Sequence, residues 1–173
     1  MSSRIKRVLR HRWLDESAAR RAIPVDMLNR LRQRVAASEL QHSGQIRIFV
    51  EGSLPLSYLW RRLSTKQIIR QRALSIFGKL RVWDTAQNNG VLIYLLLAER
   101  AIEIVADRGL NDCVDPEIWQ AMVLRMSASF QGEDFEGGLN LAIDEVSALL
   151  THHCPPKSEH SQPNELPDEP VLG

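Results

Sequence analysis

The sequence lacks the features that mark secreted and membrane-spanning proteins. It has only 2 cysteines in 173 residues, too few for the disulfide framework of a small secreted domain. Its longest apolar run, residues 91–98, is far shorter than the roughly 20 residues of a transmembrane helix. The amino terminus is basic, but it is followed by neither the apolar segment nor the small-residue cleavage site of a signal peptide. These absences predict a cytoplasmic protein.

The sequence also lacks a motif that identifies a reaction. No set of paired His and carboxylate residues indicates an activated nucleophile, so whether the chain is an enzyme stays open. His152, His153 and Cys154 are adjacent, but adjacent residues do not share a helix face, and no second cluster completes four metal ligands. Only residues 60–62, Trp-Arg-Arg, hint at a nucleic-acid surface, and we do not expect one.

Charge is divided unevenly along the chain. Residues 1–81 hold 18 Lys and Arg against 5 Asp and Glu, a net charge of +13. Residues 82–173 hold 4 against 16, a net charge of −12, which leaves the whole chain at +1. Two interpretations are open: the halves pack against each other within one domain, or the basic half binds an anionic partner.

Hydrophobic patterning divides the chain into three regions. Residues 1–22 are predicted to form a basic amphipathic helix, which suits reversible contact with an anionic membrane surface or docking on the acidic half of the chain. Residues 23–153 are predicted to form one α/β domain. Residues 154–173 contain five of the 8 prolines and no aromatic residue, so we expect a disordered, proline-rich tail there.

The order of elements in the middle region predicts the fold class. Alternation over 45–51 indicates a strand, a 3.6-residue period over 65–80 indicates a helix, and the unbroken apolar segment 90–98 indicates a central strand covered on both faces. The strand–helix–strand order predicts a parallel pair, and a short connection then predicts an antiparallel hairpin to 101–107. The expected fold is a three-layer α/β/α sandwich: a small mixed sheet with helices on both faces.

Three groups of residues resemble the landmarks of a known family. They are the turn and strand start Asn-Gly-Val-Leu at 89–92, the strand end and turn Glu-Ile-Val-Ala-Asp-Arg-Gly at 103–109, and Phe-Gln-Gly-Glu-Asp-Phe-Glu-Gly-Gly at 130–138. Their order and spacing are similar to those of the TPM domain family over residues 24–152. The family resemblance implies the α/β/α fold, and members are linked to acid phosphatase activity, divalent-cation binding and accessory roles beside membrane complexes. Without the secretion signal, membrane anchor or Gly-rich tail of many members, the chain resembles the stand-alone bacterial subgroup.

The polar turns beside the central strand carry the candidate site. Asp84, Asn88 and Asp107 supply the carboxylate and amide oxygens that Ca²⁺ or Mg²⁺ prefers, and the predicted strand order brings them to one sheet end. In a phosphatase, Arg108 would stabilise the charged phosphate. Asn88 occupies a position where many family members have an acidic residue, and the loss of a carboxylate weakens a cation site. The alternative is that these Asx residues build the turn itself, and that Asp107 and Arg108 form a salt-bridged strand exit.

Together these observations lead to two functional hypotheses. The first is a TPM-like, non-catalytic or regulatory binding module that depends on a divalent cation and has an unknown protein or a membrane surface as its partner. In that case the protein lies in the cytoplasm, peripheral to the inner face of the membrane. The alternative is a weak, metal-assisted acid phosphatase that hydrolyses phosphomonoesters.

Overall fold

A computed structural model describes residue 11 and residues 16–156 and 164–173 of the chain. Most of the predicted amino-terminal helix lies outside these residues. Its described end is α2 (Glu16–Ala22). The helices that follow are α3 (Val25–Glu39), α4 (Leu56–Leu59), α5 (Thr65–Lys79), α6 (Arg108–Asn111), α7 (Pro116–Gln131) and α8 (Phe135–His153). The strands are β1 (Gln45–Glu51), β2 (Gly90–Leu96), β3 (Ala101–Ala106) and β4 (Val171–Leu172).

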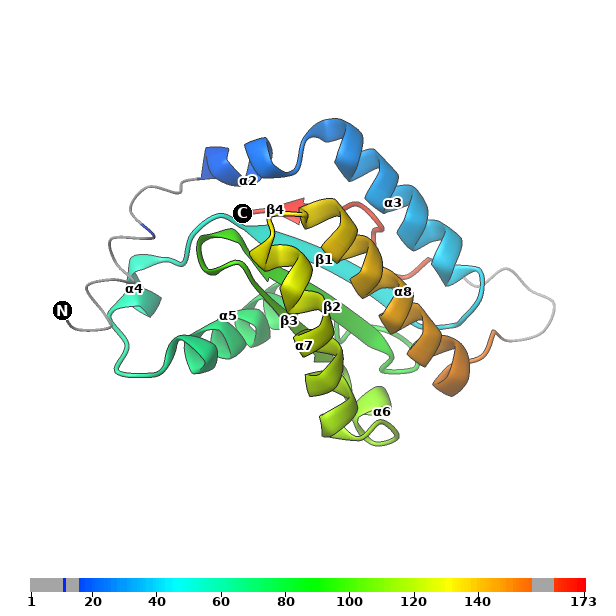
Figure 1. The fold of residues 1–173 in the computed structure, drawn as a ribbon. Helices are drawn as coiled ribbons and strands as arrows, with labels where there is room; N and C mark the ends of the chain where they lie inside the picture. Colours follow the sequence, from blue (N-terminus) through cyan, green and yellow to red (C-terminus); the bar gives the residue numbers. More distant parts are fainter. Residues whose placement is uncertain (1–10, 12–15, 157–163) are drawn as a thin grey trace.

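These strands form one mixed sheet in the order β3-β2-β1-β4 (Figure 1). β1 and β2 are parallel, with Ile48 opposite Ile93, and β2 and β3 are antiparallel, with Ile93 opposite Ile104. Both predicted pairings are therefore confirmed. The hairpin connection is longer than the residues 99–100 left between the predicted strands 90–98 and 101–107, because β2 ends at Leu96 and a 3₁₀ turn, η1 (Leu97–Glu99), follows it. Arg100 closes this turn with a φ of 49°, since neither Gly nor Asn is available for the left-handed position.

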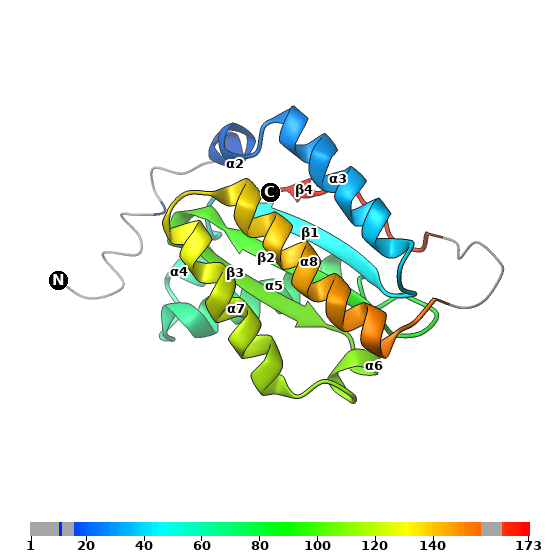
Figure 2. The ribbon, with the colours of Figure 1, turned by 45° about the vertical axis from the view of Figure 1, so that its right-hand side comes forward.

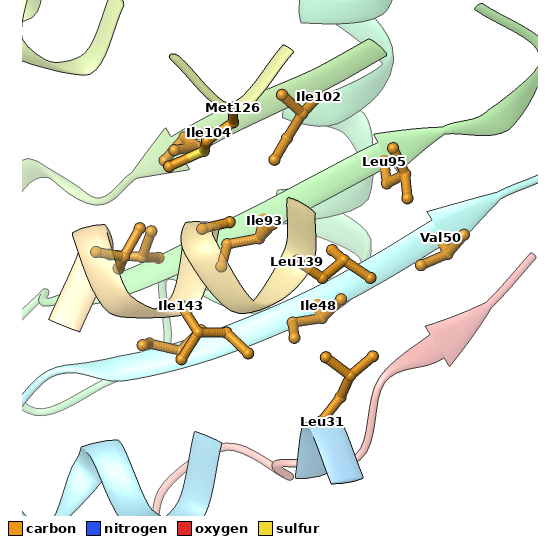
Figure 3. Packing of buried hydrophobic residues seen from close by; sticks show 14 of the residues in the cluster. Leu31, Ile48, Val50, Ile93, Leu95, Ile102, Ile104, Met126, Leu139 and Ile143 are labelled. Atoms are coloured by element: carbon orange, nitrogen blue, oxygen red, sulfur yellow. The ribbon is translucent and has the colours of Figure 1, made fainter. Parts of the chain in front are cut away.

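Helices cover both faces of the sheet, as the predicted three-layer sandwich requires. α3, α7 and α8 pack on one face together with α2, whereas α4 and α5 pack on the other (Figures 1 and 2). On the first face, Leu139 and Ile143 of α8 lie over Ile48 and Ile93 of the two central strands (Figure 3). All seven residues of β2 are buried, which explains the absence of alternation in its sequence. No helix in the described part of the chain is both long and apolar enough to cross a membrane.

Residues 164–173, here called the C-terminal strap, lie along the free edge of β1. β4 pairs in parallel with β1, with Val171 opposite Phe49. The guanidinium of Arg47 donates hydrogen bonds to the carbonyl oxygens of Pro167 and Glu169. These residues therefore differ from the disordered tail expected over 154–173. Apart from its prolines the strap has only three apolar side chains, Leu166, Val171 and Leu172, so its composition did not predict a strand. Val171 and Leu172 pair with backbone groups at the edge of β1 that would otherwise be unpaired.

Glu39 stands where α3, β1 and the strap meet. Its Oε1 accepts a hydrogen bond of 2.8 Å from the backbone N–H of Ile46. Burial raises the pKa of Glu39 to about 8, the Ile46 hydrogen bond opposes the rise, and the Asp168 carboxylate adds to it. The folded protein therefore holds this proton more tightly than the unfolded chain does. The resulting stability is complete below the ordinary pKa of 4.5 and is lost as the pH rises through about 8.

We therefore expect Glu39→Gln to be more stable than the natural chain at high pH. Glutamine keeps an oxygen for the Ile46 N–H but cannot ionise. Urea unfolding at about pH 5 and about pH 9 should show that the variant gains about 1–3 kcal/mol relative to the natural chain between the two conditions. Glu169→Gln, a change to an exposed strap carboxylate, is the matched control and should leave that difference small. An identical pH dependence in the natural chain and Glu39→Gln would disprove a buried proton at this position.

Candidate functional site

The polar loop before β2 is built by hydrogen bonds within the loop. The Asp84 N–H donates to the Arg81 carbonyl at 2.9 Å, and the Asn88 N–H donates to the Thr85 carbonyl at 3.1 Å. Arg81 and Asn88 both have a φ of 54°, the left-handed region that Asn tolerates better than most residues. The Asn89 N–H donates to Thr85 Oγ1 at 3.1 Å. Asx and Thr residues therefore shape this loop before any ligand is considered.

The loop before β2 and the segment after β3 meet at one end of the sheet, as the strand order predicted. The Gly109 N–H donates to the Asn88 carbonyl at 3.0 Å, and Arg108 Nη2 donates to Asn88 Oδ1 at 2.8 Å. A Cβ at Gly109 would lie 2.7 Å from the carbonyl oxygens of Gln87 and Asn88, so only glycine permits this approach. The structure thus brings together Asn88, Arg108 and Asp107.

Each candidate ligand already has a local partner. Asp84, whose side chain is half exposed, lies 2.6 Å from Arg81 Nη2 of its own loop. Asp107 Oδ1 accepts from the Arg108 N–H at 2.7 Å and caps α6. Asp107 Oδ2 is buried and has no hydrogen-bond partner among the described residues. One carboxylate oxygen therefore remains for a ligand.

This arrangement does not form a ready cation site. Ca²⁺ takes six to eight oxygen ligands, and the described residues contain no group of three His, Cys, Asp or Glu side chains that could hold a metal ion. The guanidinium of Arg108 beside Asn88 also places a positive charge where a cation would bind. A cation would have to displace the arginine from Asn88 and Arg81 from Asp84.

At the opposite end of the parallel pair lies a buried polar cluster that the sequence analysis did not find. Arg72 Nε and Nη2 donate to the Glu51 carboxylate at 2.9 and 2.5 Å, and the Tyr94 hydroxyl donates to Glu51 Oε2 at 2.6 Å. Burial raises the pKa of Tyr94, and the negative charge of Glu51 raises it further. The Tyr94 hydroxyl is the sole polar side-chain group of its strand, and this was the one feature of the sequence that could have indicated a buried polar contact there. These three groups satisfy one another, so the cluster is structural.

A second, partly buried cluster contains Ser, His and Glu but lacks the geometry of a nucleophile. His11 Nε2 lies 3.2 Å from Glu99 Oε1, and His11 Nδ1 lies 3.1 Å from Ser53 Oγ. However, the Leu54 N–H donates to the same Nδ1 at 3.0 Å, and the Ser53 hydroxyl can donate to the His11 carbonyl at 3.1 Å. The imidazole has no exposed surface. These contacts fasten His11 to the β1–α4 loop and give Ser53 no available base.

Comparison with known proteins identifies a family over most of the folded part of the chain. The sequence profile of the TPM domain matches residues 23–149, from the start of α3 to the last turn of α8. Among solved structures, the chain is similar to the NMR structure of BA42 protein from the psychrophilic bacterium Bizionia argentinensis, with a TM-score of 0.73 and 24% identity. The match covers 87% of this chain and 95% of that one. At this identity the likeness establishes the fold. No curated protein matches the chain.

Proposed function

Because the chain belongs to the TPM domain family, we propose that it is a non-catalytic binding module whose partner is a protein or an anionic membrane surface. This proposal rests on one observation: each polar side chain of the candidate site already has a partner within the protein. Asp84 and Asn88 are engaged by arginines and Asp107 caps a helix, which leaves Oδ2 of Asp107 as the one buried carboxylate oxygen without a partner among these three described residues and gives it no second group to form a catalytic pair. The proposal places the protein in the cytoplasm, at the inner face of the membrane.

Divalent-cation dependence is part of this proposal, with the cation replacing the guanidinium of Arg108 as the partner of Asn88. Ca²⁺ or Mg²⁺ would bind at Asp107, whose Oδ2 has no partner among the described residues, and would compete with Arg108 for Asn88. This competition between the cation and Arg108 predicts the direction in which the binding affinity changes when Arg108 is removed. Removing a unit positive charge about 4 Å from the ion should strengthen binding by about 1 kcal/mol in a water-like environment.

Calorimetric titration with Ca²⁺ and with Mg²⁺ tests both parts of this exchange. We expect weak saturable binding by the natural chain, no binding by Asp107→Ala, and about fivefold tighter binding by Arg108→Ala. Asp115→Ala removes the equivalent helix cap of α7, where the side chain accepts from the Glu117 N–H, and is the matched control with unchanged binding. Binding that is the same in all four proteins would place the ion elsewhere.

A weak acid phosphatase is the alternative, because Arg108 is exposed beside the buried Asp107 carboxylate and is accessible to a phosphomonoester. The leading proposal predicts that a chromogenic phosphate is not hydrolysed above background, with or without Mg²⁺. Hydrolysis that is present in the natural chain and Asp115→Ala but lost in Asp107→Ala and Arg108→Ala would overturn the non-catalytic proposal.

A further inference from the structure

One layer of the sandwich carries an unbalanced positive charge. Residues 52–83, which include α4 and α5, contain seven Lys and Arg and no Asp or Glu. These two helices cover their face of the sheet without α3, α7 or α8 (Figures 1 and 2). On the other face, the basic helix α3 is neutralised by α8 through Arg30–Glu136 and Arg34–Asp144 ion pairs, each at 2.6 Å. Packing of the basic half against the acidic half therefore accounts for α3, but on α5 it accounts only for Arg70, which pairs with Glu103 among the described residues.

The same layer exposes large apolar side chains. Five of the nine large hydrophobic side chains exposed in the described part of the chain lie between residues 56 and 83. Leu56 is 69% exposed and Trp60 is 68% exposed, and they are one helical turn apart, so they project from the same side of α4. Leu63 follows at 36%, and Leu74 on α5 is 48% exposed. Side chains of this size seldom gather in water without a partner.

α4 is held firmly against α5. The Arg61 guanidinium stacks on the Tyr58 ring at 3.9 Å and donates to Gln71 Oε1 of α5 at 2.5 Å. Between the two helices, Ser64 and Gln67 form a capping box that fixes the first turn of α5. These contacts fix α4 and the residues after it against α5, and the two helices together are here called the α4–α5 corner.

The basic residues of this corner divide into inward and outward sets. Arg70 and Arg72 point to the sheet, where they pair with Glu103 and Glu51. Arg62 and Lys66 are exposed and make no salt bridge to a described residue. Burial raises the pKa of Glu103, and the charges of Arg70 and, more weakly, Lys66 oppose that rise, so Lys66 lies at the border between the two sets. Here, the α4–α5 surface is defined as Leu56, Trp60, Leu63 and Leu74 with Arg62 and Lys66.

We propose that the α4–α5 surface docks on an anionic lipid membrane. This inference rests on the proposed function and identifies the partner and the contact face. Leucine and tryptophan side chains enter the boundary between headgroups and acyl chains, and arginine and lysine pair with lipid phosphates around them. Three of the four apolar residues are leucines, which cannot stack on bases, so the surface suits lipid better than nucleic acid.

Flotation of the full-length chain with vesicles tests the proposal. Vesicles of phosphatidylglycerol and phosphatidylcholine in equal parts should bind the chain, and vesicles of phosphatidylcholine alone should bind it weakly. Arg62→Glu with Lys66→Glu should lower the partition coefficient by about thirtyfold or more. Leu56→Ser with Trp60→Ser should lower it by at least about tenfold. Binding of the natural chain should also weaken as salt is added.

Matched controls come from the opposite face. Leu124 on α7 is 74% exposed and Arg32 on α3 is exposed, so Leu124→Ser and Arg32→Glu make the same chemical changes outside the proposed surface and should leave binding unchanged. Circular dichroism and thermal unfolding should show that every variant is folded. Equal losses in the α4–α5 variants and these controls would overturn the proposed surface.

The amino-terminal segment distinguishes this inference from the broader proposal. Its deletion would remove the buried Ala19 and His11, so charge reversal at Lys6, Arg7 and Arg10 is the better test. Vesicle binding that is lost with these reversals but retained in the α4–α5 variants would overturn the docking surface and leave a membrane-binding module. No vesicle binding by the natural chain would overturn the docking surface and leave a protein as the proposed partner. Binding to a single-stranded oligonucleotide that Arg62→Glu abolishes, without vesicle binding, would replace lipid by nucleic acid.

Discussion

Replacing Gly90 with alanine is expected to abolish cooperative folding of the domain. A Cβ at this position would lie 2.0 Å from the backbone oxygen of Val82 and 3.0 Å from its Cγ1. The strand cannot move away, because Gly90 is paired with Gln45 of β1 and its carbonyl accepts from the Asp107 N–H at 2.9 Å. A clash with main chain that is fixed on both sides should reduce the free energy of unfolding by more than about 4 kcal/mol.

Gly78→Ala is the matched control. Gly78 lies in α5, and a Cβ there would meet no atom within 4 Å. This variant should be more stable than the natural chain by about 0.5–1 kcal/mol, because alanine loses less backbone entropy in a helix. Urea unfolding followed by circular dichroism measures both variants. A Gly90→Ala protein within about 1 kcal/mol of the natural chain would show that the Val82 loop yields easily.

The central strand and its two neighbours could be predicted because their signals are local. Apolar and polar residues do not alternate in β2, which indicates that helices cover both faces of the strand. The long connection before β2 predicts a parallel partner, and the short connection after it predicts an antiparallel one. The same reasoning placed Asn88 and Asp107 at one sheet end. It could not show that Arg108 would bind Asn88 or that Arg81 would turn toward Asp84, because side-chain orientation in a loop depends on the packed structure.

Contacts between distant segments were not predictable from patterns of this kind. Glu51 is 43 residues from Tyr94 and 21 from Arg72, and no spacing rule relates such positions. The C-terminal strap is a similar case, because its pairing depends on an edge of β1 that exists only after the sheet has formed. The α4–α5 surface has the same origin: which leucines stay exposed is decided by the packing of two helices on the sheet.

The strongest test of the buried cluster is Glu51→Ala. The change leaves the Arg72 guanidinium, 16% exposed, without its counter-ion, and leaves the buried Tyr94 hydroxyl without an acceptor. Removing one member of a buried ion pair should reduce the free energy of unfolding by about 3–5 kcal/mol. Glu103→Ala is the matched control, because Glu103 pairs with Arg70, which lies on α5 like Arg72 but is 44% exposed. It should reduce stability by about 1 kcal/mol or less.

A second substitution separates charge loss from the loss of the hydroxyl partner. Tyr94→Phe alone should cost about 1–2 kcal/mol, since it removes a buried hydrogen bond. In the Glu51→Ala background it should be neutral or stabilising, because it deletes a hydroxyl that has lost its acceptor. Additive losses in this cycle, measured by urea unfolding, would mean that Tyr94 and Glu51 act independently. Coupled losses would show that the Tyr94 hydroxyl depends on the Glu51 carboxylate as its acceptor, so that the two side chains stabilise the sheet as one unit.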